Sequence, residues 1–593
     1  MNTFSQDYAL PSLPVPELPA TCAAVSEMLA PLVDSQALDA MLKDLGDFSR
    51  PGGDGERLQT LLVDHAAALS GNASWLRPFW DDMYLAWRDP LPIAMNYFFR
   101  FDAPRWGGDN ALPRLVLALA KVLDRLATGT LEPEAARSGV LAMDQAACCL
   151  YTRLAGLGRD TLFFVNPATS HSISVICRGH FFLVPLRGAD GALINAQALG
   201  KSFAAIREKA RSLPNTLALG ALGAAPREEA AALKAQLCEK QQNRLSLAAL
   251  EKSLFTVCLD EDYDNTDEAA RALLGGDAAN RFFDKSLQII ASSNGVLGAN
   301  FEHAGCDAAI WVYLLGCADA LLVNGPEEAQ SANDTKNRDG QDARYDSFSL
   351  LDWDITPVQR GRLASMRKDF ARRLADVDVA CRDFPEFGRD SLKNLATSPD
   401  AFLQAAFQLA QHQIFGRLRS SYEAVSVRGF AQGRTECARG SSGEALAFAL
   451  ALQKNCPQSK LFELYRQTER IHKARLQRCQ RGLGIERHIY GLRAMWELHG
   501  KALAMPEPAL FTNPAWLTLK HDALSTSGVG APFIRFFGFG PVVADGFGIG
   551  YAPESGKTGL VVSAFRSSGL SAAKFTEAFT LAAARIALVL SNS

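Results

Sequence analysis

His303 is the residue of this chain best suited to accept a proton. It lies in residues 300–307, and behind it apolar side chains recur at steps of three and four between positions 310 and 322. That spacing is typical of a helix that buries one face. A neutral imidazole can take a proton from a hydroxyl or a thiol near pH 7, and the positive end of a helix disfavours the imidazolium. We therefore expect His303 to be an uncharged base, although a lone histidine beside a buried helix is also a common structural group.

Two further groups of polar side chains suit chemistry at an anion. Residues 525–527, Ser-Thr-Ser, lie between two strand-like runs, where a hydroxyl donates a hydrogen bond to an oxyanion or simply forms a turn. Arg389 and Lys393 precede a helix that we expect to begin near residue 399. Two cations near a helix N-terminus suit a phosphate, but a solvated basic face has the same pattern.

Composition narrows the classes of partner. The chain has 593 residues and a formal net charge of -3, which gives no general attraction to nucleic acid or to anionic membranes. Its twelve cysteines have no zinc-site spacing, so we expect free thiols and no metal. No secretory, mitochondrial or peroxisomal signal and no transmembrane segment is legible. We expect a monomer in the cytoplasm or another reducing, soluble compartment.

The order of patterns along the chain predicts two α/β units. Helical patterns run to about residue 70, and a hairpin is expected from residues 173–177 and 180–184 around a glycine. Residues 324–345 are polar and suggest a solvated linker, which places a domain junction near residue 350. Long helices follow, and then a strand-rich block over residues 517–565. The five glycines from Gly538 to Gly550 do not form a dinucleotide-binding fingerprint.

Several segments occur in an order that is shared with one protein family. Among them are Phe301-Glu302-His303-Ala304 and Ser525-Thr526-Ser527. The others are residues 10–16, 83–92, 280–286, 398–402, 422–423, 433–435, 486–488 and 540–546. Over nearly its full length the chain resembles the carnitine/choline acyltransferase family.

The resemblance implies an α/β fold of two similar domains, each a mixed β-sheet flanked by helices, with an active-site tunnel where they meet. Residues 71–349 would form the N-terminal domain that carries the catalytic histidine. Residues 1–70 and 350–593 would form the C-terminal domain, which carries the motifs for CoA and carnitine.

The resemblance also assigns a role to individual residues. His303 would be the general base and Ser527 the oxyanion donor, with Asp307 paired structurally to Arg434. The substrates would be L-carnitine and acyl-CoA, with CoA as a co-substrate and no permanent cofactor. The remaining assignments are Arg389, Lys393 and Asp400 for CoA; Tyr422, Thr435, Arg487, Ser525 and Phe539 for carnitine; and Phe537 and Gly538 for the acyl pocket.

The identity of the alcohol and the length of the acyl group are the most detailed predictions. Carnitine has a carboxylate that choline lacks, and Arg487 offers a cation for it. Phe537 would plug the acyl pocket and favour acetyl or other short groups, whereas Gly538 could open another path and keeps a medium-chain enzyme possible.

Two other classes of protein are alternatives. One is a degenerate protein that binds acyl-CoA or acylcarnitine without turnover, against which the retained His303 and Ser527 argue. The other is an acyltransferase that acts on a different alcohol or on an amine, for which Arg487 and Thr435 would be harder to explain.

Overall fold

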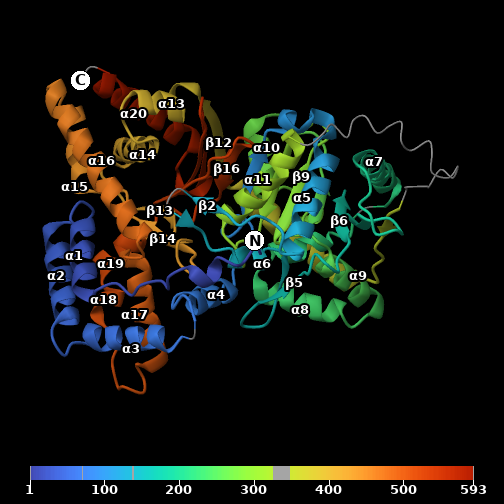
Figure 1. Ribbon diagram of the computed structural model, residues 1–593, viewed down its shortest axis with the longest axis horizontal. Coiled ribbons are helices and arrows are strands. Elements are labelled where there is room, and N and C mark those ends of the chain that lie inside the picture. Colours follow the sequence, from blue (N-terminus) through green and yellow to red (C-terminus); the bar gives the residue numbers. More distant parts are fainter. Residues whose placement is uncertain (1, 70, 137–138, 215, 325–346, 592–593) are drawn as a thin grey trace.

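The computed structural model describes residues 2–69, 71–136, 139–214, 216–324 and 347–591. Two large mixed sheets with helices around them occupy the two halves of the molecule (Figure 1). In the described residues the first sheet has eight strands and the second has six. The α/β fold with two sheet-centred domains is therefore confirmed.

The first sheet mixes parallel and antiparallel pairs. Its order is β11 (Ser349–Leu350), β7 (His180–Pro185), β6 (Ser172–Cys177), β8 (Thr256–Leu259), β9 (Leu287–Ala291), β10 (Leu297–Phe301), β1 (Tyr97–Phe101) and β16 (Ile534–Phe539). The pairs β6–β8 and β8–β9 are parallel and the others are antiparallel. The predicted hairpin is confirmed as β6–β7, with Gly179 at φ +73° in its turn.

Alternate side chains of the first sheet build two cores, as the twofold repeat of a strand requires. Phe99 and Phe301 point into a core shared with α5 (Ala111–Ala127) and α11 (Ala308–Asn324). Phe98 points into the opposite core. That core is completed by η4 (Leu219–Ala224), α8 (Arg227–Leu237), α9 (Gln241–Lys252), α10 (Thr266–Leu274) and α12 (Pro357–Ala375). The helix predicted behind His303 is confirmed as α11, and α7 (Ala196–Ser212) lies beside α5.

The second sheet is covered by long helices. Its order is β12 (Val377–Phe384), β18 (Thr558–Phe565), β17 (Phe547–Pro553), β15 (Leu524–Gly528), β13 (Ser421–Ser426) and β14 (Thr435–Ala438). Helices α14 (Pro399–Phe415) and α20 (Ala572–Ser591) pack on it and on each other, with α15 (Gly443–Gln453) and α16 (Gln458–Gln480) outside them. Short α13 (Arg389–Asn394) leads into α14.

The N-terminal helices pack against late segments of the chain. Helices α1 (Leu18–Leu29), α2 (Ser35–Ser49) and α3 (Asp54–Ala68) lie beside α17 (Ile485–His499), α18 (Ala509–Thr512) and α19 (Pro514–Lys520) (Figure 1). Together they bury a separate apolar core. Helix α4 (Arg77–Leu85) follows them and contributes Trp80 and Tyr84 to the same core.

Strand β16 joins the two halves. It is hydrogen-bonded to β1 in the first sheet while its other side packs on β17 and β18 of the second. A Cβ atom at Gly550 would lie 2.1 Å from the Phe537 carbonyl oxygen, and one at Gly559 would lie 2.3 Å from the Arg535 carbonyl oxygen. Glycine is required at both positions because a backbone occupies the place of a side chain.

Several expectations have a mixed outcome. The block predicted as strand-rich begins with a helix, α19, before its strands start at Leu524. The polar linker lies almost wholly outside the described residues. Although β16 belongs to the segment that we assigned to the second domain, it completes the first sheet. All twelve cysteines are free, and among the described helices we find none with the length and apolarity needed to cross a bilayer.

Candidate active site

His303 lies in the turn between β10 and α11, at the end of the first sheet that faces α4. Its ring is held between Tyr84 and Tyr97, at centroid distances of 5.4 and 5.1 Å, and its side chain is 29% exposed. Burial lowers the pKa of His303 below its usual value. The imidazole is therefore largely uncharged near pH 7, and the largest cause is burial between the two rings. Helix α11 begins only at Ala308.

Asp307 and Arg434 form the predicted ion pair beside this ring. Arg434 donates from Nε to Asp307 Oδ2 at 3.0 Å, and also to the carbonyl oxygens of Ala304 and His303. Asp307 Oδ1 is 3.9 Å from His303 Nδ1, which is too long for a hydrogen bond. Arg434 thus fixes the turn, while Asp307 acts on the imidazole only through its charge. Because Nδ1 is buried, Nε2 is the ring nitrogen left to meet a substrate.

The two serines of the Ser-Thr-Ser segment face β16. Ser525 and Ser527 are in register with Gly548 and Gly550 of the parallel neighbour β17. A side chain at either glycine would collide with the backbone of β16 or of the segment directly after it. Paired residues of parallel strands point to the same side, so both serines are directed toward the strand that joins the two sheets. Thr526 points the other way and donates to the carbonyl oxygen of Tyr422.

Three residues predicted to bind the carnitine carboxylate are adjacent. Tyr422 is in register with Ser525, and Thr435 is in register with a residue on the same face of β13. Arg487 donates from Nε to the Thr435 carbonyl oxygen at 3.0 Å and from Nη2 to the Tyr422 hydroxyl at 3.2 Å. Its Nη1 makes no hydrogen bond with the described residues. One guanidinium nitrogen is therefore free for a ligand.

Aromatic rings of α4 connect this cation to the candidate base. The Arg487 guanidinium lies over the Trp80 ring at 4.3 Å from its centroid. The centroids of Trp80 and Tyr84 are 5.8 Å apart, and Tyr84 contacts His303. Sequence analysis missed both rings, although the resemblance covered residues 83–92 and therefore Tyr84. Helix α4 thus places the Arg487 guanidinium and the His303 ring along one continuous aromatic wall.

Phe537 and Gly538 point to opposite sides of β16. The Phe537 ring packs against Tyr97, Phe99 and Phe539, at centroid distances of 6.2, 5.7 and 5.7 Å. A Cβ atom at Gly538 would lie 2.7 Å from the Phe98 ring. The idea that this glycine opens a second acyl path is therefore wrong, because Phe98 already fills the space beside it.

Two of the residues assigned to CoA are exposed, and the third already has protein partners. Arg389 and Lys393 are exposed on α13, and the Lys393 ammonium makes no hydrogen bond or ion pair with the described residues. Asp400 accepts hydrogen bonds from the Tyr551 hydroxyl at 2.8 Å and from His472 Nε2 at 2.9 Å. The two cations are free to meet a phosphate, whereas Asp400 already has protein partners.

A family model described as choline/carnitine O-acyltransferase matches residues 13–580. The chain belongs to this family. It is therefore an acyltransferase that uses CoA.

Three relatives illustrate the range of this acyltransferase family. The chain is 29% identical to choline O-acetyltransferase of Homo sapiens over 97% of this chain and 78% of that protein. It is 28% identical to carnitine O-acetyltransferase of Rattus norvegicus, over 94% and 90%. It is 30% identical to the muscle isoform of carnitine O-palmitoyltransferase 1 of Homo sapiens, over 96% and 76%. Because these names differ in both the alcohol and the acyl group, identity alone selects neither for this family member.

Glu302 is a buried residue beside His303 to which the sequence analysis assigned no role. Its carboxylate accepts from Arg153 Nη1 at 2.9 Å, from the Tyr151 hydroxyl at 2.5 Å and from the Ala304 amide at 2.9 Å. Glu302, Arg153 and Tyr151 are fully buried. They hold the backbone on both sides of His303. The signals in the sequence were its place in the shared segment of residues 301–304 and a charged residue directly after an apolar strand.

Proposed function

We propose that this acyltransferase moves a short acyl group, most simply acetyl, reversibly between CoA and the hydroxyl of L-carnitine. His303 Nε2 accepts the hydroxyl proton as the carnitine oxygen attacks the thioester carbonyl. The tetrahedral oxyanion accepts a hydrogen bond from Ser527. When the intermediate collapses, the C–S bond breaks and the CoA sulfur takes the proton from the imidazolium. No acyl-enzyme forms, since the base acts directly on the second substrate.

The observation that carries the carnitine assignment is the free nitrogen of Arg487. The guanidinium is held by Thr435 and Tyr422 and lies on the same aromatic wall as His303. A carboxylate there would gain a charge-assisted hydrogen bond. Choline has no carboxylate and would leave Nη1 of this half-buried guanidinium without an acceptor from the ligand. Trimethylammonium would pack near Phe539, whose aromatic face attracts a cation.

Phe537 supports a short acyl group. Its ring is 3% exposed and packs against Tyr97, which itself contacts His303. An acyl chain that extends from the reacting carbonyl into this side of β16 would meet the ring after a few carbons. Gly538 offers no second path, because Phe98 closes its side. For CoA, the exposed cations Arg389 and Lys393 suit the 3′-phosphate.

Replacement of Arg487 tests whether carnitine is the alcohol that accepts the acyl group. Arg487→Ala should raise the carnitine KM about tenfold or more, because a charge-assisted hydrogen bond contributes roughly 1.5–3 kcal/mol. Steady-state release of the CoA thiol at varied carnitine, with the acetyl-CoA KM as internal reference, measures this. Arg493→Ala is a matched control on the same helix, since Arg493 pairs with Glu497 at the surface. An unchanged carnitine KM in Arg487→Ala, or a wild type that prefers choline, would refute the assignment.

A further inference from the structure

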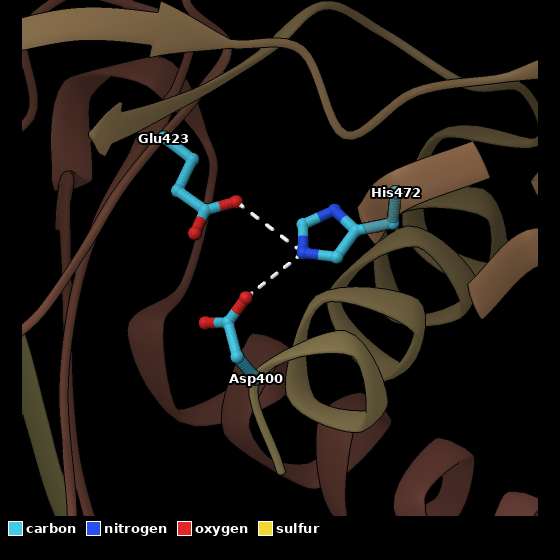
Figure 2. Close-up of side chains that lie close together, drawn as sticks. All are labelled: Asp400, Glu423 and His472. Atoms are coloured by element: carbon cyan, nitrogen blue, oxygen red, sulfur yellow. Dashed lines mark hydrogen bonds and ion pairs between the residues drawn. The ribbon is translucent and has the colours of Figure 1, made fainter. Parts of the chain in front are cut away.

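Three side chains of the kinds that bind metals converge between α14, β13 and α16. Asp400 lies in the first turn of α14, Glu423 on β13 and His472 in the middle of α16, and Figure 2 shows both carboxylates directed at the imidazole. His472 Nε2 is 2.9 Å from Asp400 Oδ2 and 3.7 Å from Glu423 Oε2. One donor atom from each residue lies within 4.8 Å of the other two. Each donor comes from a different, regular element, so the arrangement is rigid.

The cluster is short of positive charge. Glu423 is 5% exposed, and its Oε2 is buried without a hydrogen bond. No arginine or lysine among the described residues forms an ion pair with Asp400 or Glu423. Burial and the neighbouring Asp400 carboxylate raise the pKa of Glu423 well above its usual range. Two carboxylates that share a single imidazole as their basic partner are costly in a protein interior.

We propose that His472, Asp400 and Glu423 bind one divalent transition-metal ion, for which Zn²⁺ is the best match. One imidazole nitrogen and two carboxylate oxygens are ligands that Zn²⁺ accepts, and they leave a fourth position for water. Donors about 2.0 Å from a tetrahedral ion are separated by about 3.3 Å. The two distances from Nε2 lie on either side of that value. Asp400, whose side chain is 34% exposed, gives an ion access from solvent.

Binding would exchange a proton for the ion. The Glu423 carboxyl loses its proton to solvent, and the imidazole turns its Nε2 lone pair to the metal, with its proton on Nδ1. The Tyr551 hydroxyl keeps its hydrogen bond to Asp400 Oδ1, which holds the other oxygen in place. The test of this metal site uses no substrate. Its outcome therefore does not depend on whether the alcohol is carnitine or choline.

Titration of the full chain with Co²⁺, followed by displacement with Zn²⁺, tests the site. We expect one Co²⁺ per chain, with visible d–d bands of a nitrogen and oxygen site and without the near-ultraviolet charge-transfer bands of a thiolate. The spectrum distinguishes this site from the twelve cysteines. His472→Gln and Glu423→Gln should each weaken Co²⁺ affinity about 100-fold or more, since each removes a direct ligand. Glu423→Gln replaces a protonated carboxyl with a neutral group of the same shape, so it should fold normally.

His521→Gln is the matched control. His521 Nε2 lies 2.6 Å from Asp545 Oδ1, a histidine with a single carboxylate partner, and its loss should leave Co²⁺ affinity unchanged. If the wild type bound Co²⁺ no more tightly than Glu423→Gln, the proposal would be overturned. The three side chains would then only share protons by hydrogen bonding. Thiolate charge-transfer bands in the wild type would also overturn it. Thermal melts of each variant establish that the folded chains are compared.

Discussion

At the scale of single residues, the reactivity of His303 depends on what surrounds the ring. Burial between Tyr84 and Tyr97 lowers its pKa, the charge of Asp307 raises it, and the charge of Arg434 lowers it. The net direction is downward, so the neutral form dominates near pH 7. The sequence placed the histidine correctly beside a helix but gave no way to see the two rings, which come from separate segments of the chain.

His303→Gln should reduce kcat by about 10²–10⁴-fold, the usual contribution of a general base. Glutamine keeps polar atoms near the position of the ring but accepts no proton from an alcohol. Single-turnover rates with acetyl-CoA and carnitine measure the chemical step directly. His180→Gln, in the surface hairpin, serves as a control with wild-type kcat expected. A rate within about threefold of wild type for His303→Gln would exclude His303 as the base.

The pH dependence follows from the direction of the pKa shift. The imidazole must be unprotonated to act, and burial holds its pKa below the ordinary range of a histidine, so kcat/KM should hold its plateau at pH 7 and fall only in more acidic solution. Asp307→Asn removes the charge that raises this pKa, which should move the acid limb to still lower pH. The same change removes the nearest carboxylate from the buried Arg434, which keeps two carbonyl acceptors and a contact of 3.8 Å with Asp81. The free energy of unfolding should fall by less than about 3–5 kcal/mol, the cost of a buried charge left without any partner. An acid limb above pH 6.5 in the wild type contradicts the buried-base assignment.

Phe537 should set the limit on acyl length. Phe537→Ala removes the ring and should raise the ratio of octanoyl-CoA to acetyl-CoA turnover, while the cavity lowers stability by about 3–5 kcal/mol. Phe536→Ala is a matched control, because Phe536 is equally buried but points into the opposite core. If both variants change the ratio equally, the effect is general loosening and Phe537 does not line the acyl pocket.

At the scale of elements, the turn between β10 and α11 is held from both sides of the molecule. Arg434 enters from the second half to bind its carbonyl oxygens, and Glu302 accepts from Arg153 and Tyr151 of the first. The helix after the turn and the hairpin β6–β7 could be predicted because their periodicity and turn residues are local. The buried charges could not, since their partners lie far away in the sequence.

Glu302→Gln tests how this turn positions the base. The buried Arg153 guanidinium has two carboxylate partners, Glu302 and Asp160, and the change leaves only Asp160. We therefore expect a lower kcat with little change in either KM. A general loss of structure would instead lower the amount of active enzyme, which active-site titration reports separately. Glu261→Gln breaks an exposed pair with Arg178 and should behave as wild type. An unaltered kcat in Glu302→Gln would mean that the charged hydrogen bonds of Glu302 are not needed to position the turn that carries His303.

At the scale of the whole molecule, β16 makes one body of two sheets. The sequence predicted strands in this region, and β15 to β18 lie there. It did not show that β16 would pair with β1, because strand pairing between distant segments leaves no local pattern. The glycines at positions 548, 550 and 559 have their explanation only in that crossing, where a backbone fills the space of a side chain.

Gly550→Ala should therefore destabilise the protein. Its Cβ would lie 2.1 Å from the Phe537 carbonyl oxygen, and relief of such overpacking typically costs about 1–3 kcal/mol. Urea unfolding monitored by fluorescence gives the difference. Gly556→Ala is the control, since nothing lies within 4 Å of a Cβ there. Equal stability of the two variants would show that β16 can move away from β17 without loss.

Closure of the first sheet by β16 also has a consequence for biosynthesis. On a ribosome, residues 97–101 emerge long before residues 534–539, so one edge of β1 has to wait, unpaired, for almost the whole chain. An unpaired edge is a template for association with other chains. Nascent chains of this protein should thus depend on chaperones until the last strands leave the exit tunnel. Prematurely terminated chains, which lack β16, should depend on them throughout.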